Sequence, residues 1–295
     1  MTAVAFDAKL KLLPGDFIDG RYEAARRIAR GGMAEVWAVR HLAIDQEFAM
    51  KLLAPLCGLN DDTVSRFELE ARLGGLLGRR THHVVPVVDE GLYFGRPYLV
   101  MPLYEGISLE DRIEQGPLVP EESARVVRHV ARALTVAHAV GIVHRDLKPG
   151  NVLLTREDGR MIARVIDFGL ARGAPGMQPF CRHHTSNGIV LGTPMNMSPE
   201  QARGEIVDER ADVWGLACLA YRSLLAKDAF TGRSTREVLI HVCEAEFKLP
   251  TTIMPSLPRA IDGVFARAFA RAIDRRFPTP RAFSDAYESA LGIVR

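Results

Sequence analysis

The sequence lacks the features that define several large classes of protein. Its four cysteines lie far apart, at positions 57, 181, 218 and 243, and form no CxxC pair. This excludes a disulfide framework and predicts a reducing, cytoplasmic compartment. No apolar run reaches about 18 residues, so we expect no membrane span. Residues 1–13 have no long apolar core and include Asp7, which argues against a signal peptide.

The charge balance argues against a nucleic-acid-binding protein. The 38 basic and 36 acidic residues leave a net charge of +2, and no basic stripe indicates a nucleic-acid partner. Internal repeats and low-complexity tracts are also absent from the sequence. The 295 residues are 47% hydrophobic, which is enough to bury a sizeable core in one large domain or in two lobes.

The N-terminal part of the chain has the pattern of β-strands. Short apolar segments separated by turn residues predict about five strands, at 22–28, 35–40, 47–53, 84–88 and 97–101. A helix is expected at 60–78, with Val64, Phe67, Ala71 and Gly74 on one side. We interpret residues 1–20 as a short leader and residues 102–106 as a linker to a helical remainder of the chain.

From residue 108 the period becomes helical. A helix is expected from Pro120 to about residue 140, because apolar residues recur at helical spacing and Gly141 suits its C-terminal cap. A short strand pair is predicted at 152–154 and 163–166. Further helices are predicted at 211–225, from a capping box at Ser234 and Glu237 onward, at 258–273, and at 280–291 with Thr279 as N-cap.

Five short motifs interrupt this pattern. They are a small-residue turn at 29–36, Lys51 at the end of an apolar strand, Glu70 in the first helix, the loop His144-Arg145-Asp146-Leu147-Lys148-Pro149-Gly150-Asn151, and Asp167-Phe168-Gly169. Pro149 and Gly150 exclude a regular helix in the loop. Each motif alone has an ordinary explanation, since paired glycines usually form hairpin turns and a lysine or glutamate is usually solvated.

In this order and spacing, the motifs resemble those of the protein kinases, and Lys148-Pro149-Gly150-Asn151 is most similar to bacterial eukaryotic-type Ser/Thr kinases. The resemblance covers about residues 22–291. It implies an α+β, two-lobed kinase fold: a small β-rich N-lobe at 21–102 with one regulatory helix, and a larger, mainly α-helical C-lobe at 103–295. Residues 1–20 would precede this single kinase domain.

The resemblance also implies a division of chemical roles. Phosphoryl transfer depends on positioning and charge stabilisation more than on covalent chemistry by the protein. Lys51, held by Glu70, would neutralise the α- and β-phosphates of ATP. Asp146 would orient the hydroxyl of a protein serine or threonine and accept its proton, while Lys148 would offset charge on the γ-phosphoryl. The implied ligands of Mg²⁺ are Asn151 and Asp167.

The implied adenine site is apolar, with Met101 as gatekeeper at its back. The Pro102 carbonyl and the Tyr104 N–H would contact the edge of the base, and the side chains of Ile28, Val36, Ala49 and Leu153 would enclose it. The phosphates would lie under the turn formed by Ala29, Arg30, Gly31, Gly32, Met33 and Ala34. Only the middle glycine of the usual G-x-G-x-x-G pattern is present there, because Ala29 and Ala34 replace the other two.

Several residues downstream have implied structural or regulatory roles. Gly192-Thr193-Pro194 and Ser198-Pro199-Glu200 resemble the substrate-docking segment of Ser/Thr kinases. Glu200 would pair with Arg276 in a buried salt bridge, and Asp212 would brace the loop backbone. Arg145 would bind a phosphorylated residue of the activation loop. Thr185, or its neighbour Ser186, is the expected site of autophosphorylation, for which a homodimer is one route.

Two other functions fit parts of the pattern. A pseudokinase that binds nucleotide or partner proteins without efficient catalysis would explain the altered glycine turn. A small-molecule phosphotransferase on the related fold usually has a His-Gly-Asp type loop and lacks the Ser-Pro-Glu segment, whereas this chain has the kinase versions of both. Cys181, His183 and His184 do not complete the four ligands of a structural zinc site.

Overall fold

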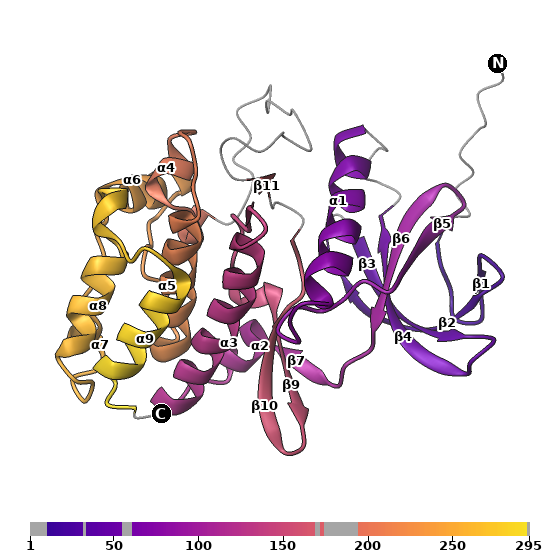
Figure 1. The fold of residues 1–295 in the computed structure, drawn as a ribbon, viewed down its shortest axis with the longest axis horizontal. Coiled ribbons are helices and arrows are strands. Elements are labelled where there is room, and N and C mark those ends of the chain that lie inside the picture. The colour runs from indigo at the N-terminus through magenta and orange to yellow at the C-terminus, as the bar shows by residue number, and fades with distance from the viewer. Residues whose placement is uncertain (1–10, 32–33, 55–60, 169–171, 174–193, 294–295) are drawn as a thin grey trace. The chain divides into compact units, whose positions relative to one another are not determined.

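A computed structural model of the protein describes residues 11–31, 34–54, 61–168, 172–173 and 194–293. The chain divides into two compact units, Met1–Gly78 with Val85–Tyr104 and Arg79–Val84 with Glu105–Arg295. The first unit holds an antiparallel sheet and one helix, and the second is mainly helical (Figure 1). The expected α+β fold with a β-rich N-lobe and a helical C-lobe is therefore confirmed.

The sheet of the first unit has the strand order β1-β2-β3-β4-β6-β5, and every neighbouring pair is antiparallel. Its elements, with the helix inserted between β4 and β5, are β1 Phe17–Ile18, β2 Tyr22–Arg30, β3 Ala34–His41, β4 Gln46–Leu53, α1 Asp61–Gly78, β5 Asp89–Tyr93 and β6 Arg96–Pro102.

Strand register gives this sheet two different faces, because alternate residues point to opposite sides of a strand. One face buries the apolar core of the unit, which includes Trp37, Val39, Met50, Leu52, Tyr98 and Val100. The other face receives α1, whose Phe67 and Ala71 pack with Leu53 and Leu99. The apolar side predicted for this helix is confirmed.

The predicted strand at 84–88 is wrong. Val84 forms only an isolated bridge with Val165, and the strand begins later, at Asp89. Pro86 has no N–H to give to a ladder. The segment instead lies against the end of α1, where a Cβ on Gly78 would come within 2.4 Å of Pro86 Cβ and a Cβ on Gly74 within 2.5 Å of Val87 Cγ2.

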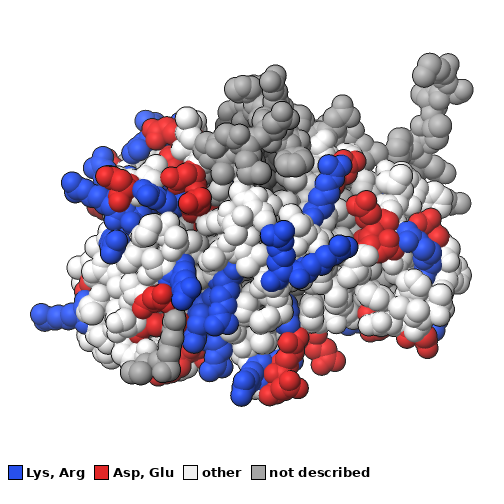
Figure 2. All heavy atoms as spheres, viewed as in Figure 1, with Lys and Arg blue, Asp and Glu red and all other residues white. Residues whose placement is uncertain are grey.

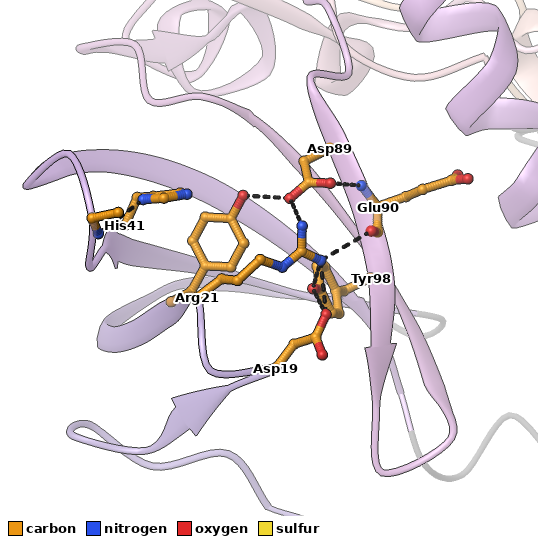
Figure 3. Close-up of polar contacts among 8 residues, drawn as sticks. Asp19, Arg21, His41, Asp89, Glu90 and Tyr98 are labelled. Atoms are coloured by element: carbon orange, nitrogen blue, oxygen red, sulfur yellow. Dashed lines mark hydrogen bonds and ion pairs between the residues drawn. The ribbon is translucent and has the colours of Figure 1, made fainter.

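Residues 11–20, which the sequence pattern assigns to a leader, contribute instead to the first unit. Leu12 and Ile18 are fully buried in its core, and Phe17–Ile18 pairs with β2. Just after this strand, Arg21 binds the Asp89 carboxylate at 2.6 Å and the Tyr98 hydroxyl at 2.8 Å (Figure 3). These contacts attach the start of β2 to β5 and β6.

In the described part of the chain, no helix has the length and apolar content that a bilayer crossing needs. The second unit contains the remaining elements. They are β7 Gly106–Ser108, α2 Leu109–Glu114, α3 Pro120–His138, β8 Ile142–Val143, η1 Pro149–Asn151, β9 Val152–Glu157, β10 Arg160–Val165, β11 Arg172–Gly173, η2 Pro194–Asn196, α4 Pro199–Ala202, α5 Arg210–Leu225, α6 Thr235–Glu244, α7 Pro250–Ile253, α8 Ala260–Ala268, η3 Ile273–Arg275 and α9 Pro280–Ala290.

Helix α5 forms the centre of the second unit and is buried along almost its whole length. Trp214 stacks on Phe230 with ring centroids 5.1 Å apart, and both rings meet Phe269 at 5.0 Å. Phe269 directly follows α8, so the helix predicted at 258–273 ends earlier than expected. The carbonyl of Ala270 accepts a hydrogen bond from Arg276 Nε instead of continuing the helical ladder.

The predicted helix caps agree with the structure in part. The Thr279 hydroxyl accepts from the Ala282 N–H at 3.1 Å, as expected for an N-cap of α9. The Ser234 hydroxyl likewise accepts from the Glu237 N–H at 3.2 Å. The reciprocal bond of a capping box is absent, because the Glu237 carboxylate accepts from the Arg233 N–H.

His83, in the Arg79–Val84 segment, stacks on His129 of α3 with ring centroids 4.3 Å apart. The Ala163 N–H donates to His129 Nδ1 at 3.1 Å, and the Ala163 carbonyl lies 3.2 Å from His83 Nδ1. Burial lowers the pKa of His83 to about 4 and that of His129 to about 3. Both rings are therefore neutral at pH 7, which allows them to stack without charge repulsion and to tie this segment to the second unit.

The glycines of α1 provide a test of this packing. Replacing Gly78 by alanine should lower the free energy of unfolding by about 1–3 kcal/mol, because the new methyl group would overlap Pro86. In Gly75→Ala the nearest atom is the Val87 carbonyl oxygen at 3.7 Å, so this variant should gain up to about 1 kcal/mol of helix propensity. Urea unfolding of both variants measures the difference, and equal stabilities would contradict the proposed contact.

Candidate active site

The loop that contains Asp146 is held by one buried carboxylate. Asp212, on α5, accepts hydrogen bonds from the backbone N–H groups of His144 at 2.8 Å and Arg145 at 2.9 Å, and a third contact from His138 Nε2 at 2.7 Å. Burial alone would raise the pKa of Asp212, but the hydrogen bond and charge of His138 hold it below its usual value. The bracing role expected for Asp212 matches this geometry.

The backbone of the loop is strained at Arg145, whose φ of 68° lies in the left-handed region. For a residue other than glycine, this conformation costs about 1–2 kcal/mol. It is held from both sides, because the Arg145 N–H donates to Asp212 and the Arg145 carbonyl accepts from Gln201 Nε2 at 2.7 Å. The strained turn thereby fixes the direction of the next residue, Asp146.

Three polar groups of the loop converge around Asp146. Lys148 Nζ lies 3.1 Å from Asp146 Oδ2, and both side chains are partly accessible. Asn151 Nδ2 donates to the Asp146 carbonyl at 3.0 Å, and the Asp146 N–H donates to His144 Nδ1 at 3.3 Å. The Asp146 carboxylate thus lies beside a cation, on a backbone that neighbouring residues hold in place.

A hairpin brings Asn151 and Asp167 to the same end of the second unit. Strands β9 and β10 pair antiparallel with Val152 opposite Val165, and the Ile166 N–H donates to the Asn151 carbonyl at 3.0 Å. The strand pair predicted here is confirmed and is longer than expected. Next to Asp167, the Phe168 ring packs against the His144 ring, with the two ring centroids 4.7 Å apart.

These residues offer oxygen donors suited to a hard cation. Asp167 has a carboxylate and Asn151 a carboxamide oxygen, and the described residues contain no cluster of three or more His, Cys, Asp or Glu that could hold a metal by itself. A small protein donor set of this kind fits Mg²⁺, which usually binds one or two carboxylates together with substrate phosphates and water.

A buried ion pair supports the segment after the loop. Arg276 Nη1 and Nη2 bind the two oxygens of Glu200 at 2.7 and 2.8 Å, and both side chains are almost inaccessible to water. Burial acts to raise the pKa of Glu200, yet its hydrogen bonds to Arg276 hold the value below normal. The pairing expected from the sequence is therefore present. It keeps α4, which carries Gln201, in place.

In the first unit, Lys51 of β4 and Glu70 of α1 form a close pair. Lys51 Nζ lies 2.6 and 2.7 Å from the two oxygens of Glu70. Glu70 is buried and Lys51 is only partly exposed, so water screens this contact less than it would a surface pair. The ordinary explanation of both residues as solvated side chains is excluded by this geometry.

Five of the residues expected to hold a nucleotide lie on the Lys51 face of the sheet. Val36 pairs directly with Lys51 and Ala49 pairs with Met101, and directly paired residues share a face. Ala29 and Ala34 share that face by the same register. Ile28 is 43% exposed near a bulge of β2. Pro102 ends β6 and Tyr104 follows it, while Leu153 belongs to β9 of the second unit.

Some residues of the expected site lie outside the described part of the chain, and two residues that support the Asp146 loop were not expected. Gly32, Met33, Gly169, Thr185, Ser186 and Thr193 lie outside the described residues, as do Cys181, His183 and His184. His138 and Gln201 were missed by sequence reasoning. Gln201 follows Ser198 at the spacing of a capping box, a signal that was present, and its side chain accepts from the Ser198 N–H at 3.1 Å.

The chain belongs to the protein kinase family, because a model of the protein kinase domain matches residues 22–281. Members of this family use ATP together with a divalent metal. The crystal structure of the kinase domain of Mycobacterium tuberculosis PknI is 28% identical to this chain, with a TM-score of 0.71, and the match covers 95% of this chain and 100% of that domain.

Two of the curated relatives are bacterial proteins. The chain is 34% identical over 92% of its length to the serine/threonine-protein kinase Pkn1 of Myxococcus xanthus, of which it covers 38%. It is 36% identical over 90% of its length to the DNA damage-responsive serine/threonine-protein kinase RqkA of Deinococcus radiodurans, of which it covers 39%. The chain thus spans about two fifths of the length of these curated relatives.

Replacing Asp212 by alanine tests the support of the loop. The change leaves the buried His144 N–H and the partly buried Arg145 N–H without their acceptor, so the free energy of unfolding at pH 7 should fall by about 3–5 kcal/mol in a urea titration. Because the pKa of Asp212 is lower folded than unfolded, its stabilisation is present above about pH 4 and is lost as the pH falls further.

The difference in the free energy of unfolding between wild type and Asp212→Ala should therefore become smaller below about pH 4. Glu209→Ala is the matched control, since Glu209 is an exposed acidic residue at the same end of α5. A loss below about 1 kcal/mol for Asp212→Ala would contradict the bracing role, because a single satisfied hydrogen bond already contributes that much.

Proposed function

We propose that the chain is an ATP-dependent serine/threonine protein kinase, which transfers the γ-phosphoryl group of ATP to serine and threonine hydroxyls of proteins. The observation that carries the proposal is the Asp146–Lys148 pair on a backbone fixed by Asp212 and Gln201. The names of the bacterial relatives support the same activity. Because the chain spans only part of those relatives, the substrates of the whole protein belong to the proposal too.

In this mechanism Asp146 accepts a hydrogen bond from the substrate hydroxyl, orients its oxygen toward the γ-phosphorus and takes its proton. As the new P–O bond forms, the bond between the γ-phosphorus and the β–γ bridging oxygen breaks, and ADP leaves with that oxygen. Lys148, 3.1 Å from Asp146, stabilises the negative charge on the γ-phosphoryl oxygens. Neither residue forms a covalent intermediate. Their contribution is position and charge, which the strained turn at Arg145 supplies before substrate arrives.

Residues of the first unit hold the nucleotide. Lys51 binds the α- and β-phosphates, and Glu70 keeps its ammonium group in place. The adenine packs on the apolar side chains of Val36, Ala49, Met101 and Ile28. The Pro102 carbonyl accepts a hydrogen bond from the base, so the N–H that proline lacks is not needed there. The Tyr104 N–H donates a hydrogen bond to the base.

Asn151 and Asp167 hold a divalent cation, which we propose is Mg²⁺ and which neutralises phosphate charge when it is bound. The backbone N–H groups of residues 29–34 would bind the phosphates. With alanines at 29 and 34, this turn has less conformational freedom than a glycine-rich one. We propose the cytoplasm as the compartment because it supplies ATP. The free thiols of Cys218 and Cys243 are compatible with its reducing conditions.

Asp146→Asn should lower kcat by about 10²–10⁴-fold, because the carboxamide cannot accept the proton. The measurement is transfer of labelled phosphate from ATP with Mg²⁺ to a basic protein substrate, followed by phosphoamino acid analysis. Asp158→Asn is the control, since Asp158 lies in an exposed turn with φ of 49° that asparagine tolerates. A wild-type chain without any transfer would instead identify a pseudokinase.

Autophosphorylation at Thr185, which lies outside the described residues, is proposed to increase activity through Arg145. Thr185→Ala should then lower the rate of substrate phosphorylation several-fold and remove one phosphopeptide after incubation with ATP. The matched control is Thr252→Ala, far along the chain in α7. Full activity together with an unchanged phosphopeptide pattern in Thr185→Ala would refute the proposal. A homodimer would allow one copy to modify the other.

A further inference from the structure

A cavity of about 350 Å³ lies between α3 and α9 in the second unit. Arginines come into it from both helices: Arg128 and Arg132 from α3, and Arg281 from α9. Figure 2 shows Lys and Arg side chains gathered over the part of the second unit where Figure 1 places these two helices. None of the three arginines has a role in the proposed phosphoryl transfer.

In the part of the chain that the structure describes, the side chains that line the cavity carry a net positive charge. Asp285 also lines the cavity, and its carboxylate lies 3.8 Å from Nε of the exposed Arg281 side chain. Three arginines and one acidic residue therefore line the cavity. Glu288, just outside the lining, forms an ion pair with Arg128, with its carboxylate 2.9 Å from Arg128 Nε. Even with both carboxylates counted, the five groups carry a formal charge of +1. Arg128 and Arg132 are also one helical turn apart, a like-charge spacing that disfavours the helix unless an anion lies between them.

A buried hydroxyl gives a second, independent indication of a ligand. Ser284 lines the cavity and is 2% exposed, and its hydroxyl has no hydrogen-bond partner in the part of the chain that the structure describes. An unpaired buried hydroxyl is unfavourable. The hydroxyl of Thr135, at the same cavity, is already bonded to the Ala131 carbonyl at 2.7 Å.

We propose that this cavity binds a small organic phosphate, a phosphate monoester on a short carbon body. Guanidinium groups suit the phosphate because their planar forks can each donate two parallel hydrogen bonds to its oxygens. Ala131 and Val136 provide an apolar wall for the carbon body. The volume lies at the lower end of that of small-molecule sites, and this favours a metabolite-sized ligand over a protein segment.

Isothermal titration of the full chain with glycerol 3-phosphate tests the proposal, at constant ionic strength and with Mg²⁺-ADP present to fill the proposed nucleotide site. Arg132→Gln should weaken binding about tenfold. Asp285→Asn should tighten it several-fold, since a carboxylate that repels the ligand is removed. Arg125→Gln is the matched control because Arg125 is an exposed arginine of the same helix that does not line the cavity.

The proposal is overturned if glycerol 3-phosphate does not bind, or if Arg125→Gln weakens binding as much as Arg132→Gln. Inorganic phosphate binding as tightly as glycerol 3-phosphate would refute the role of the apolar wall, and binding of uncharged glycerol would refute that of the arginines. Urea midpoints of the variants show that each is folded. Kinase activity is not the readout, so failure of the proposed function leaves this test unaffected.

Discussion

The second unit depends on the hydrogen bonds that satisfy the buried carboxylate of Asp212. A charge in the interior is unfavourable unless hydrogen bonds compensate for the lost water. Here the compensation comes from His138 at the end of α3 and from two backbone N–H groups of the loop after that helix. The need to satisfy one side chain therefore joins two helices to the loop. It also holds Arg145 in a backbone conformation that few residues adopt freely.

The same principle organises the first unit around Lys51 and Glu70. The ion pair joins a sheet strand to the single helix of that unit, beside the apolar contacts of Phe67 and Ala71. Buried ion pairs contribute little net stability compared with apolar packing, but they fix direction. For a family whose chemistry rests on position and charge, fixed direction of a cation is what the site requires.

The structure also differs from the sequence pattern where packing overrides local preference. The apolar residues at 84–88 are typical of a strand, yet Pro86 and Val87 lie against Gly74 and Gly78 of α1. A sequence window shows that these residues are apolar, but not which surface they pack against. In the same way, the helix expected to reach residue 273 ends at Ala268, because Phe269 belongs to the aromatic cluster around Trp214.

The sequence by itself determined the fold family, most helices and strands, and the identity of the charged residues, because periodicity and ordered motifs are properties of the chain. Pairings with sequence signals, such as Glu200 with Arg276, could also be expected from the family resemblance. Only the tertiary structure decided that Gln201 and His138 support the Asp146 loop, that His83 stacks on His129, and that three arginines meet at one cavity. These contacts join residues distant along the chain, and their geometry arises only when the helices pack.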